Sequence, residues 1–314
     1  MRNEQLLDKL CCPETRIALV CNDGYLVTVD HNKRYPITYS GIPLFAESLC
    51  SVDAQRQKAH YEKIAEIYVQ NLGYPHTQEY MAYLDRVFLE IAVEADLSEA
   101  AEICCGQGEL LSLVGEKIGT GIGVDISPSM LEIAQEKHCQ YRNFQFIQGD
   151  ATLLPIKAHS MRSVFMFGGI HHVPDRQALF SEIFRILAPG GKFYFREPVS
   201  DFFLWRLLRA FIYRFSPALD ADTERPLIWN ETVPILEAVG FELQSWNTYG
   251  FIGFCLFMNS DVLVFNRFFR FMPGIRKITR WLADFDDWIV RLPAFGRIGL
   301  QVVGVAKKPQ NEIK

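Results

Sequence analysis

From about residue 100 onward, the pattern of apolar and polar residues switches repeatedly between segments typical of strands and segments typical of helices. Short apolar runs of strand length are followed by stretches in which apolar residues recur at helical spacing. The runs predict strands at residues 100–104, 121–126, 144–148, 162–167, 192–196, 241–249 and 298–306. Helices are expected at residues 128–137, 175–187 and 231–239. This α/β order predicts a mostly parallel sheet with helices on both faces.

The first part of the chain follows a different pattern. Residues 1–50 are predicted to form a small β-rich module, because short apolar runs flank Asn22-Asp23-Gly24, a good hairpin-turn signal. Residues 52–97 instead carry apolar side chains at helical spacing. We therefore expect a small module at 1–50 and a larger domain at 51–314.

Two hydrophobic segments interrupt the larger domain. Residues 199–230 are expected to form a helical cap or insertion, and residues 251–292 combine Phe, Leu and Trp with scattered arginines. A solvated surface does not need so much apolar area. The segments either roof a hydrophobic acceptor pocket, rest on an anionic membrane, or pack on the sheet or in a homodimer interface. The sequence leaves these alternatives open.

Composition narrows the class of protein. The chain of 314 residues is 49% apolar and has a formal net charge of −5, which disfavours a nucleic-acid-binding protein. Its eight cysteines are irregularly placed, unlike a disulfide framework. No signal peptide and no apolar run of membrane-spanning length are apparent. We expect a cytoplasmic protein, with peripheral membrane contact as an open alternative.

The stretch with the most informative chemistry is residues 102–108, which lie between a predicted strand and a helix-like segment. Backbone at Gly106 and Gly108 can approach a ligand closely, because glycine has no Cβ. Asp125 ends the next predicted strand, where its carboxylate can accept hydrogen bonds from a ribose diol. Cys104 stands where a dinucleotide fingerprint has its first glycine, so a nucleoside without phosphates is the better prediction.

Further motifs follow in order, at Gly149-Asp150-Ala151, Pro155, residues 167–172 and residues 187–191. With residues 102–108 and Asp125, this ordered set resembles the class I S-adenosylmethionine-dependent methyltransferases, especially the small-molecule branch that includes quinone methyltransferase-like enzymes. The resemblance covers about residues 55–308. It implies a Rossmann-like, seven-stranded, mostly parallel sheet, and S-adenosylmethionine as cofactor.

The resemblance also implies roles for individual residues. Glu102 would bind the cofactor ammonium, Asp125 the ribose hydroxyls and Asp150 the adenine amino group. Ile126 and Met130 would sandwich the adenine ring, and two tyrosines of a lid helix would face the sulfonium. The expected cofactor-binding residues are Tyr61, Tyr68, Glu102, Cys104, Gly106, Gly108, Asp125, Ile126, Met130, Asp150, Ala151 and Phe167.

His171 and His172 follow the fourth strand of the α/β pattern and are the candidate catalytic bases, His171 slightly ahead. At the end of the fifth strand, Arg196 and Glu197 are candidates for contact with the acceptor. Phe203 and Trp205 are expected to bind a hydrophobic acceptor from the helical insertion. For all of these residues, packing or local salt bridges remain the alternative.

The N-terminal module resembles the small zinc-ribbon-like module of the Trm112 type. The positions that match the family's zinc ligands read Cys12, Thr15, Thr28 and His31. Because hydroxyl groups do not hold structural zinc, we expect no metal there. An irregular site of Cys12, Cys21 and His31 is the alternative.

The acceptor is expected to be a hydrophobic small molecule, lipid-like, quinone-like or polyketide-like, methylated on O or C in small-molecule biosynthesis. Residues 168–171 read Gly-Gly-Ile-His, whereas enzymes that methylate nucleic acids or glutamine commonly carry Asn/Asp-Pro-Pro-aromatic there. A non-catalytic S-adenosylmethionine-binding or scaffold protein that partners another enzyme is the main alternative. A nicotinamide-dependent oxidoreductase is a weaker one.

Overall fold

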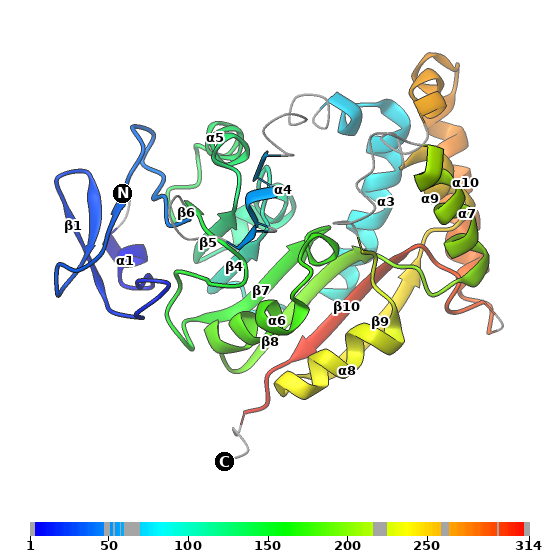
Figure 1. Ribbon diagram of the computed structural model, residues 1–314. Helices are drawn as coiled ribbons and strands as arrows, with labels where there is room; N and C mark the ends of the chain where they lie inside the picture. The colour runs from blue at the N-terminus through cyan, green and yellow to red at the C-terminus, as the bar shows by residue number, and fades with distance from the viewer. Residues whose placement is uncertain are drawn as a thin grey trace.

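The computed structural model describes residues 4–46, 51–52, 54–56, 58–59, 70–215, 225–258, 264–293 and 295–310. Within these residues, seven strands form one sheet in the order β6–β5–β4–β7–β8–β10–β9 (Figure 1). The strands are β4 (Glu99–Ile103), β5 (Thr120–Asp125), β6 (Phe144–Gln148), β7 (Met161–Phe167), β8 (Leu187–Pro198), β9 (Glu242–Tyr249) and β10 (Gln301–Lys307). Strands β6, β5, β4, β7 and β8 pair in parallel, and β10 runs antiparallel to both of its neighbours. The predicted seven-stranded, mostly parallel sheet is therefore confirmed.

Helices cover both faces of this sheet. One face buries its core against α6 (Arg176–Ile186) and α8 (Trp229–Val239). The other face packs against α3 (Pro75–Ile91), α4 (Glu109–Val114), α5 (Pro128–Lys137) and α10 (Ile275–Val290). The remaining described helices are α1 (Glu4–Leu7), α7 (Phe203–Phe215), α9 (Ile252–Phe257) and the short 3-10 turns η1 (Gly115–Lys117), η2 (Ile170–His172) and η3 (Val264–Phe271).

Local sequence signals fix where the helices that follow the strands begin. Ser127 caps α5, its Oγ accepting from the Met130 N–H at 3.4 Å, and Pro128 occupies the first turn. Asp175 caps α6, its carboxylate accepting from the Ala178 N–H at 2.9 Å. Both helices therefore start next to the carboxyl ends of strands, which is the edge where ligands bind in parallel sheets.

Strand β8 is longer than the sequence pattern predicted. It begins at Leu187, before the Pro-Gly-Gly turn, and a register shift against β7 between Met161 and Ser163 accommodates that turn. The sequence pattern predicted that the helix ends at residue 187 and that the strand begins at residue 192. In the structure the irregularity lies inside the strand, as β-bulges do.

The N-terminal module forms the predicted hairpin and then packs on the main sheet. Its antiparallel sheet consists of β1 (Leu19–Asn22), β2 (Tyr25–Thr28) and β3 (Arg34–Pro36). Leu10 bridges to Ile156 and Leu44 bridges to Gln148, the last residue of β6. Apolar side chains of the module share one core with the central sheet; they include Leu6, Leu10, Leu26, Tyr35 and Phe45. The module thus covers the β6 edge of the sheet.

Candidate active site

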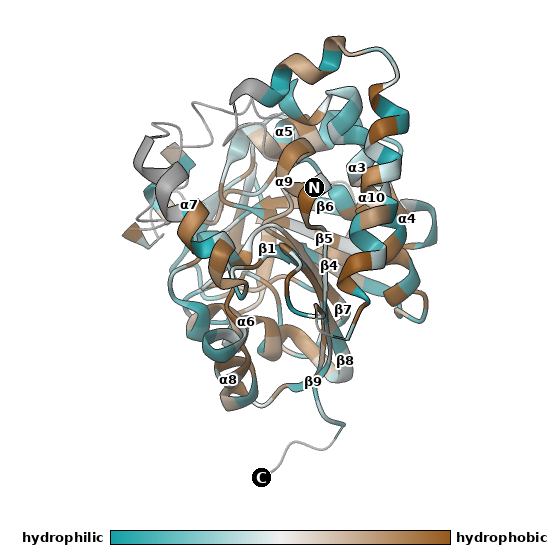
Figure 2. Ribbon diagram, turned by 90° about the vertical axis from the view of Figure 1, so that its right-hand side faces the viewer, coloured by the Kyte–Doolittle hydropathy of each residue, from teal (hydrophilic) through white to brown (hydrophobic). Residues whose placement is uncertain are grey.

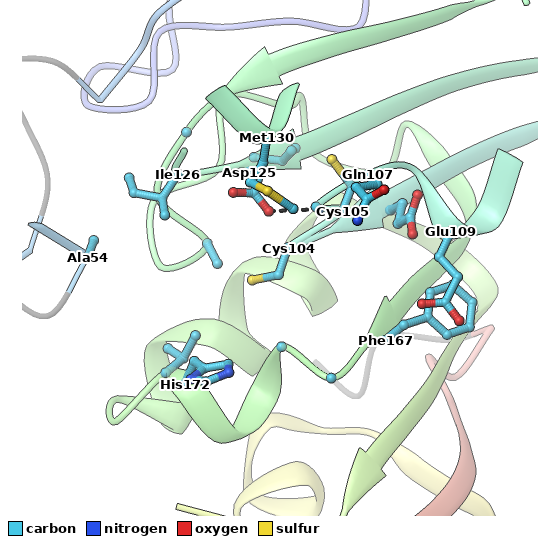
Figure 3. Close-up of a pocket in the computed structure, with 18 of the residues that line it drawn as sticks. Ala54, Cys104, Cys105, Gln107, Glu109, Asp125, Ile126, Met130, Phe167 and His172 are labelled. Carbon is cyan, nitrogen blue, oxygen red and sulfur yellow. Dashed lines mark hydrogen bonds between the residues drawn. The ribbon is translucent and has the colours of Figure 1, made fainter. Parts of the chain in front are cut away.

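A cavity of about 610 Å³ lies at the carboxyl ends of the parallel strands (Figure 3). Its volume lies within the usual range for small-molecule sites. Its lining includes Glu102, Cys104, Gly106, Asp125, Ile126, Met130, Asp150, Ala151, Phe167 and His172. Nine of the twelve residues expected to bind a cofactor thus surround one space.

The turn after β4 owes its shape to three residues with left-handed backbone. These are Cys104 with φ of 55°, Gly106 with φ of 46° and Gly108 with φ of 76°. A Cβ on Gly108 would come within 2.9 Å of the His138 ring, which explains why glycine is required there although Gly108 does not line the cavity. Cys104 occupies a conformation that favours glycine, and its sulfur points into the cavity (Figure 3).

The side chain of Cys104 also explains why position 169, after β7, is a glycine. A Cβ on Gly169 would lie 2.6 Å from the Cβ of Cys104, closer than atoms can approach. The side chain at position 104 and the missing side chain at 169 are therefore matched. The segment that carries His172 can approach the first turn only because Gly169 has no side chain.

Glu102 has a buried carboxyl group at the base of this turn. Its Oε1 accepts from the Leu110 N–H at 3.1 Å, whereas its Oε2 is buried with no hydrogen-bond partner among the described residues. Burial raises the pKa of Glu102 to about 8. An oxygen in this state is suited to a cationic donor, because a buried acceptor without a partner is unfavourable.

Asp125 ends β5 and organises the loop beside it. Its Oδ2 accepts from the Gly106 N–H at 2.8 Å, and its Oδ1 accepts from the Ser127 N–H at 2.9 Å. Burial raises the pKa of Asp125. Each carboxylate oxygen can accept more than one hydrogen bond, so Asp125 retains acceptor sites for ligand hydroxyl groups.

Asp150 joins the site to the segment that follows the N-terminal module. Its Oδ1 accepts from the Thr152 N–H at 2.8 Å and the Thr152 hydroxyl at 2.7 Å, and its Oδ2 accepts from the Ser51 N–H at 2.9 Å. Ser51 and Ala54 line the cavity, and Ala54 lies on its far side from Phe167 in Figure 3. The N-terminal part of the chain therefore contributes directly to the site.

The two histidines on η2 face different surroundings. His172 lines the cavity, whereas the described lining does not include His171. The Nδ1 atom of His171 lies 2.9 Å from Oε2 of Glu197, whose Oε1 accepts from the N–H groups of Gly169 and Ile170 at 2.7 and 2.8 Å. Glu197 thus holds the η2 turn in place through hydrogen bonds to its backbone and to the imidazole of His171.

The His171–Glu197 contact is a hydrogen bond from a neutral ring. Burial, with the nearby guanidinium groups of Arg209 and Arg176, lowers the pKa of His171 to about 3. Burial also raises the pKa of Glu197 to about 7. We assign the proton to Nδ1, which donates to Glu197 and leaves Nε2 as an acceptor. The ring centroids of His171 and His172 are 3.9 Å apart. The hydrogen bond from His171 to Glu197 therefore also orients His172, which lines the cavity.

The four residues expected to bind the acceptor are not part of the described lining of this cavity. Phe203 is 56% exposed, and Trp205 is half-buried against the core on the α3 side. Arg196 is buried and forms ion pairs with Asp85 at 2.8 Å and with Glu109, both of which line the cavity. Arg196 and Glu197 therefore lie behind the wall of the site, and the roles of all four residues stay predictions. Tyr61 and Tyr68 lie outside the described residues.

Several lining residues carried no signal in the sequence. Met81 and Asp85, one turn apart on α3, and Gln78 line the cavity from a segment that was predicted only to be helical. Lys137 at the end of α5 lines it as well, and burial lowers the pKa of this amine. The spacing of Met81 and Asp85 could have suggested a shared face, but nothing in the sequence places that face over the strand ends.

In the N-terminal module, the thiol of Cys12 has hydrogen-bond partners. The Sγ of Cys12 lies 3.0 Å from the Tyr35 hydroxyl and accepts from the Thr15 N–H at 3.4 Å. Over the described ranges, no group of three or more His, Cys, Asp or Glu residues could hold a metal ion. That the module binds no zinc stays a prediction.

Comparison with known proteins gives one family match. Residues 101–195 match the sequence model of a methyltransferase domain. A demethylmenaquinone methyltransferase from Staphylococcus saprophyticus is 31% identical over 143 residues, covering 44% of this chain and 61% of that protein. The enzyme of the same name from Staphylococcus aureus is 29% identical over 143 residues, covering 44% of this chain and 59% of that protein. The chain spans about three fifths of the length of these relatives.

Solved structures share the fold at low identity. The [4+2]-cyclase SpnF has a TM-score of 0.56 at 16% identity, over 82% of this chain and 97% of its own. A complex of the Haloferax volcanii Trm112 methyltransferase activator with a putative methyltransferase has a TM-score of 0.56 at 17% identity, over 82% of this chain and 99% of that chain. These likenesses show the fold alone.

Proposed function

We propose that this chain, which belongs to the class I S-adenosylmethionine-dependent methyltransferases, transfers a methyl group from that cofactor to an O or C atom of a hydrophobic, quinone-like small molecule. The observation that carries the proposal is Glu102. A buried carboxylate oxygen with no described partner lies beside the first turn, in the same cavity as Asp125.

The residues present fit the cofactor. The ammonium of its methionine part would supply the donor that Oε2 of Glu102 lacks, and Asp125 would accept from the ribose hydroxyls. Ile126 and Met130 both line the cavity and would hold the adenine between them. When bound, S-adenosylmethionine supplies a methyl group already activated by a positive sulfur.

The chain's own contribution is to orient the acceptor and to remove a proton from it. His172 lines the cavity together with Cys104 and Gly169, and it is the better placed of the two histidines for contact with an acceptor. His171 and Glu197 act as positioning residues, because they hold η2 from behind. This reverses the order of preference that the sequence suggested for the two histidines.

The quinone-like acceptor is supported by the named activity of the two staphylococcal relatives. The fold alone does not specify methyl transfer, since the similar cyclase is named for a different reaction. The main alternative is a protein that binds S-adenosylmethionine without turnover.

Cofactor binding is tested by isothermal titration calorimetry with S-adenosylmethionine and its demethylated product. We expect micromolar binding, roughly −8 kcal/mol at a Kd of about 1 μM. Glu102→Gln should weaken binding by about 1.5–3 kcal/mol, the scale of a hydrogen bond to a charged group. Because burial raises the pKa of Glu102, wild-type binding should also release a proton, detected as a buffer-dependent heat that the variant lacks.

The exposed Glu132, changed to Gln, is the matched control on α5 and should change neither quantity. Tighter binding of NADH than of S-adenosylmethionine would contradict the family role of the site.

Turnover is tested by incubation with demethylmenaquinone and detection of a product heavier by one methyl group. His172→Ala should lose about 10²–10⁴ in turnover and still bind the cofactor, if His172 removes a proton. Cofactor binding with no methylated product from any quinone-like acceptor would favour the non-catalytic alternative.

A further inference from the structure

Helix α10 has two apolar stripes, and the described parts of the chain cover one of them. Its buried stripe includes Ile275, Ala283 and Val290 and packs on α3 and α9. The second stripe, on another side of the helix, consists of Ile278, Trp281, Phe285 and Trp288. Trp281 and Trp288 are 66% and 58% exposed, and Phe285 lies between them with ring centroids 6.2 and 5.9 Å away.

The neighbouring turn η3 also exposes aromatic rings. Phe268 and Phe271 are 59% and 68% exposed, and η3 contacts α10. The guanidinium of Arg267 lies 5.2 Å from the centroid of the Phe268 ring, and that of Arg270 lies 4.6 Å from the Phe271 ring. We call Phe268, Phe271, Ile278, Trp281, Phe285 and Trp288 the aromatic face.

The charge around the aromatic face differs from that of the whole chain. Residues 264–297 contain seven Lys or Arg residues and three Asp residues, in a chain with a net charge of −5. Of the acidic three, Asp286 is buried and Asp287 pairs with Arg291 at 2.9 Å. Of the basic seven, Arg276 and Arg280 pair with Glu79 of α3, at 3.7 and 2.7 Å. Lys277 and Asp284 are both exposed and lie at helical spacing from Trp281, so the excess of positive charge comes from the exposed Arg267 and Arg270 on η3. Basic side chains therefore predominate beside the exposed rings.

We propose that the aromatic face docks on the surface of an anionic lipid bilayer. Trp and Phe with flanking Arg and Lys are the combination that seats a helix in the interface of a membrane. An anionic surface complements the predominance of basic residues. Two-fold contact with a second copy would instead bring two basic surfaces together, which is unfavourable. No described helix is long and apolar enough to cross a membrane, so contact would be at the surface.

The position of the aromatic face relative to the cavity is also informative. Helix α3 packs against α10 on one side, and its Gln78, Met81 and Asp85 line the cavity. In Figure 2, α7, α9 and α10 are spread from left to right across the side that faces the viewer. A docked molecule would thus hold its cavity one helix away from the lipid. The docking proposal goes beyond methyl transfer and does not rest on it.

Flotation with vesicles tests the proposal. We expect the full chain to float with vesicles of phosphatidylcholine and phosphatidylglycerol in equal parts, and much less with phosphatidylcholine alone. Lys277→Glu should lower partitioning onto the anionic vesicles by roughly tenfold, because each basic residue near the surface contributes to binding. The double variant Trp281→Ser with Trp288→Ser should lose flotation on both vesicles.

Tyr39→Ser is the matched control, because Tyr39 is a fully exposed aromatic residue on the N-terminal module, at the other end of the molecule. It should float like the wild type. Unchanged flotation of the tryptophan double variant would overturn the proposal. So would a wild-type dimer, seen by light scattering, that the double variant abolishes, since a second copy would then cover the face. Neither result would affect cofactor binding, which tests the proposed function separately.

Discussion

The N-terminal module and the helices around α10 cover opposite ends of the same sheet, but they do so by different physical means (Figure 1). The module completes the β6 edge with backbone hydrogen bonds, in which Phe45 N–H donates to the Gln148 carbonyl at 3.0 Å and Gln148 N–H donates to the Pro43 carbonyl at 2.9 Å. At the other end, α10 buries one stripe and exposes an aromatic one. One end is closed by the chain itself, whereas the described residues leave aromatic side chains exposed at the other, where we propose that lipid docks.

The closed end reaches the candidate site. The Gln148 side chain accepts from the Ala46 N–H at 3.1 Å and donates to the carbonyl of Ile126 at 3.3 Å, and Ile126 lines the cavity. Ser51, which follows the module, donates to Asp150. Damage to the module is therefore expected to weaken both the fold and the site. Damage to the aromatic face should leave both intact, and the predictions below rest on this contrast.

Among the polar contacts, the largest effect is expected from Glu182→Ala at the closed end. Glu182 on α6 accepts from Arg16 of the module at 2.9 Å, from Arg185 at 2.7 Å and from the Leu154 N–H at 2.7 Å. Its removal leaves the Leu154 N–H without its acceptor, and the guanidinium groups of Arg16 and Arg185 keep only carbonyl acceptors. This should lower the free energy of unfolding by about 2–4 kcal/mol. Urea unfolding measures this directly.

Glu132→Ala on the exposed side of α5 is the control, and it should change stability by no more than about 0.5 kcal/mol. Equal stability of the two variants would mean that the module is not held by this contact.

An intermediate effect is expected from pH at the open end. His76 on α3 is buried beside Phe257 and Phe269, and both of its ring nitrogens lack a hydrogen-bond partner among the described residues. Burial lowers the pKa of His76. Above the ordinary pKa of about 6.5, the ring is neutral in both the folded and the unfolded protein. As pH falls below that value, the unfolded chain binds a proton that the folded protein does not, so the free energy of unfolding falls.

The measurement compares unfolding of the wild type and His76→Phe at about pH 7.5 and about pH 5.5. The wild type should lose up to about 1.4 kcal/mol more than the variant per unit of pH, the slope for one proton. Burial also lowers the pKa of His138 and His171, so both proteins retain a slope from those residues. Identical slopes in the two proteins would show that His76 is protonated without cost.

Much of the closed part of the fold could be predicted from the sequence. The periodicity of strands and helices predicted the sheet, and α5 spans the predicted residues 128–137. Residues 102–108 and Asp125 indicated the turn, because left-handed backbone and a carboxylate at a strand end leave local signals.

The rest depends on contacts between distant residues. That His172 rather than His171 lines the cavity depends on Glu197, 26 residues beyond His171, which no local pattern reveals. The lining from α3 depends on how that helix packs across the sheet. The aromatic face could be predicted only as apolar area without a partner, since periodicity cannot tell a stripe that is buried from one that is exposed.

The smallest effect on stability is expected from Trp281→Ala. An exposed ring on the aromatic face loses little when it is removed, so the free energy of unfolding should change by less than about 0.5 kcal/mol. Phe45→Ala is the matched comparison at the closed end, where the ring is buried 4.8 Å from Tyr35, and it should cost about 3–5 kcal/mol. Urea unfolding at two protein concentrations measures both.

If Trp281→Ala cost as much as Phe45→Ala only at the higher concentration, a second copy would cover the aromatic face, because stability that depends on association rises with concentration. If the cost were equal at both concentrations, another part of the same chain would cover it, and the two ends of the sheet would be closed in the same way.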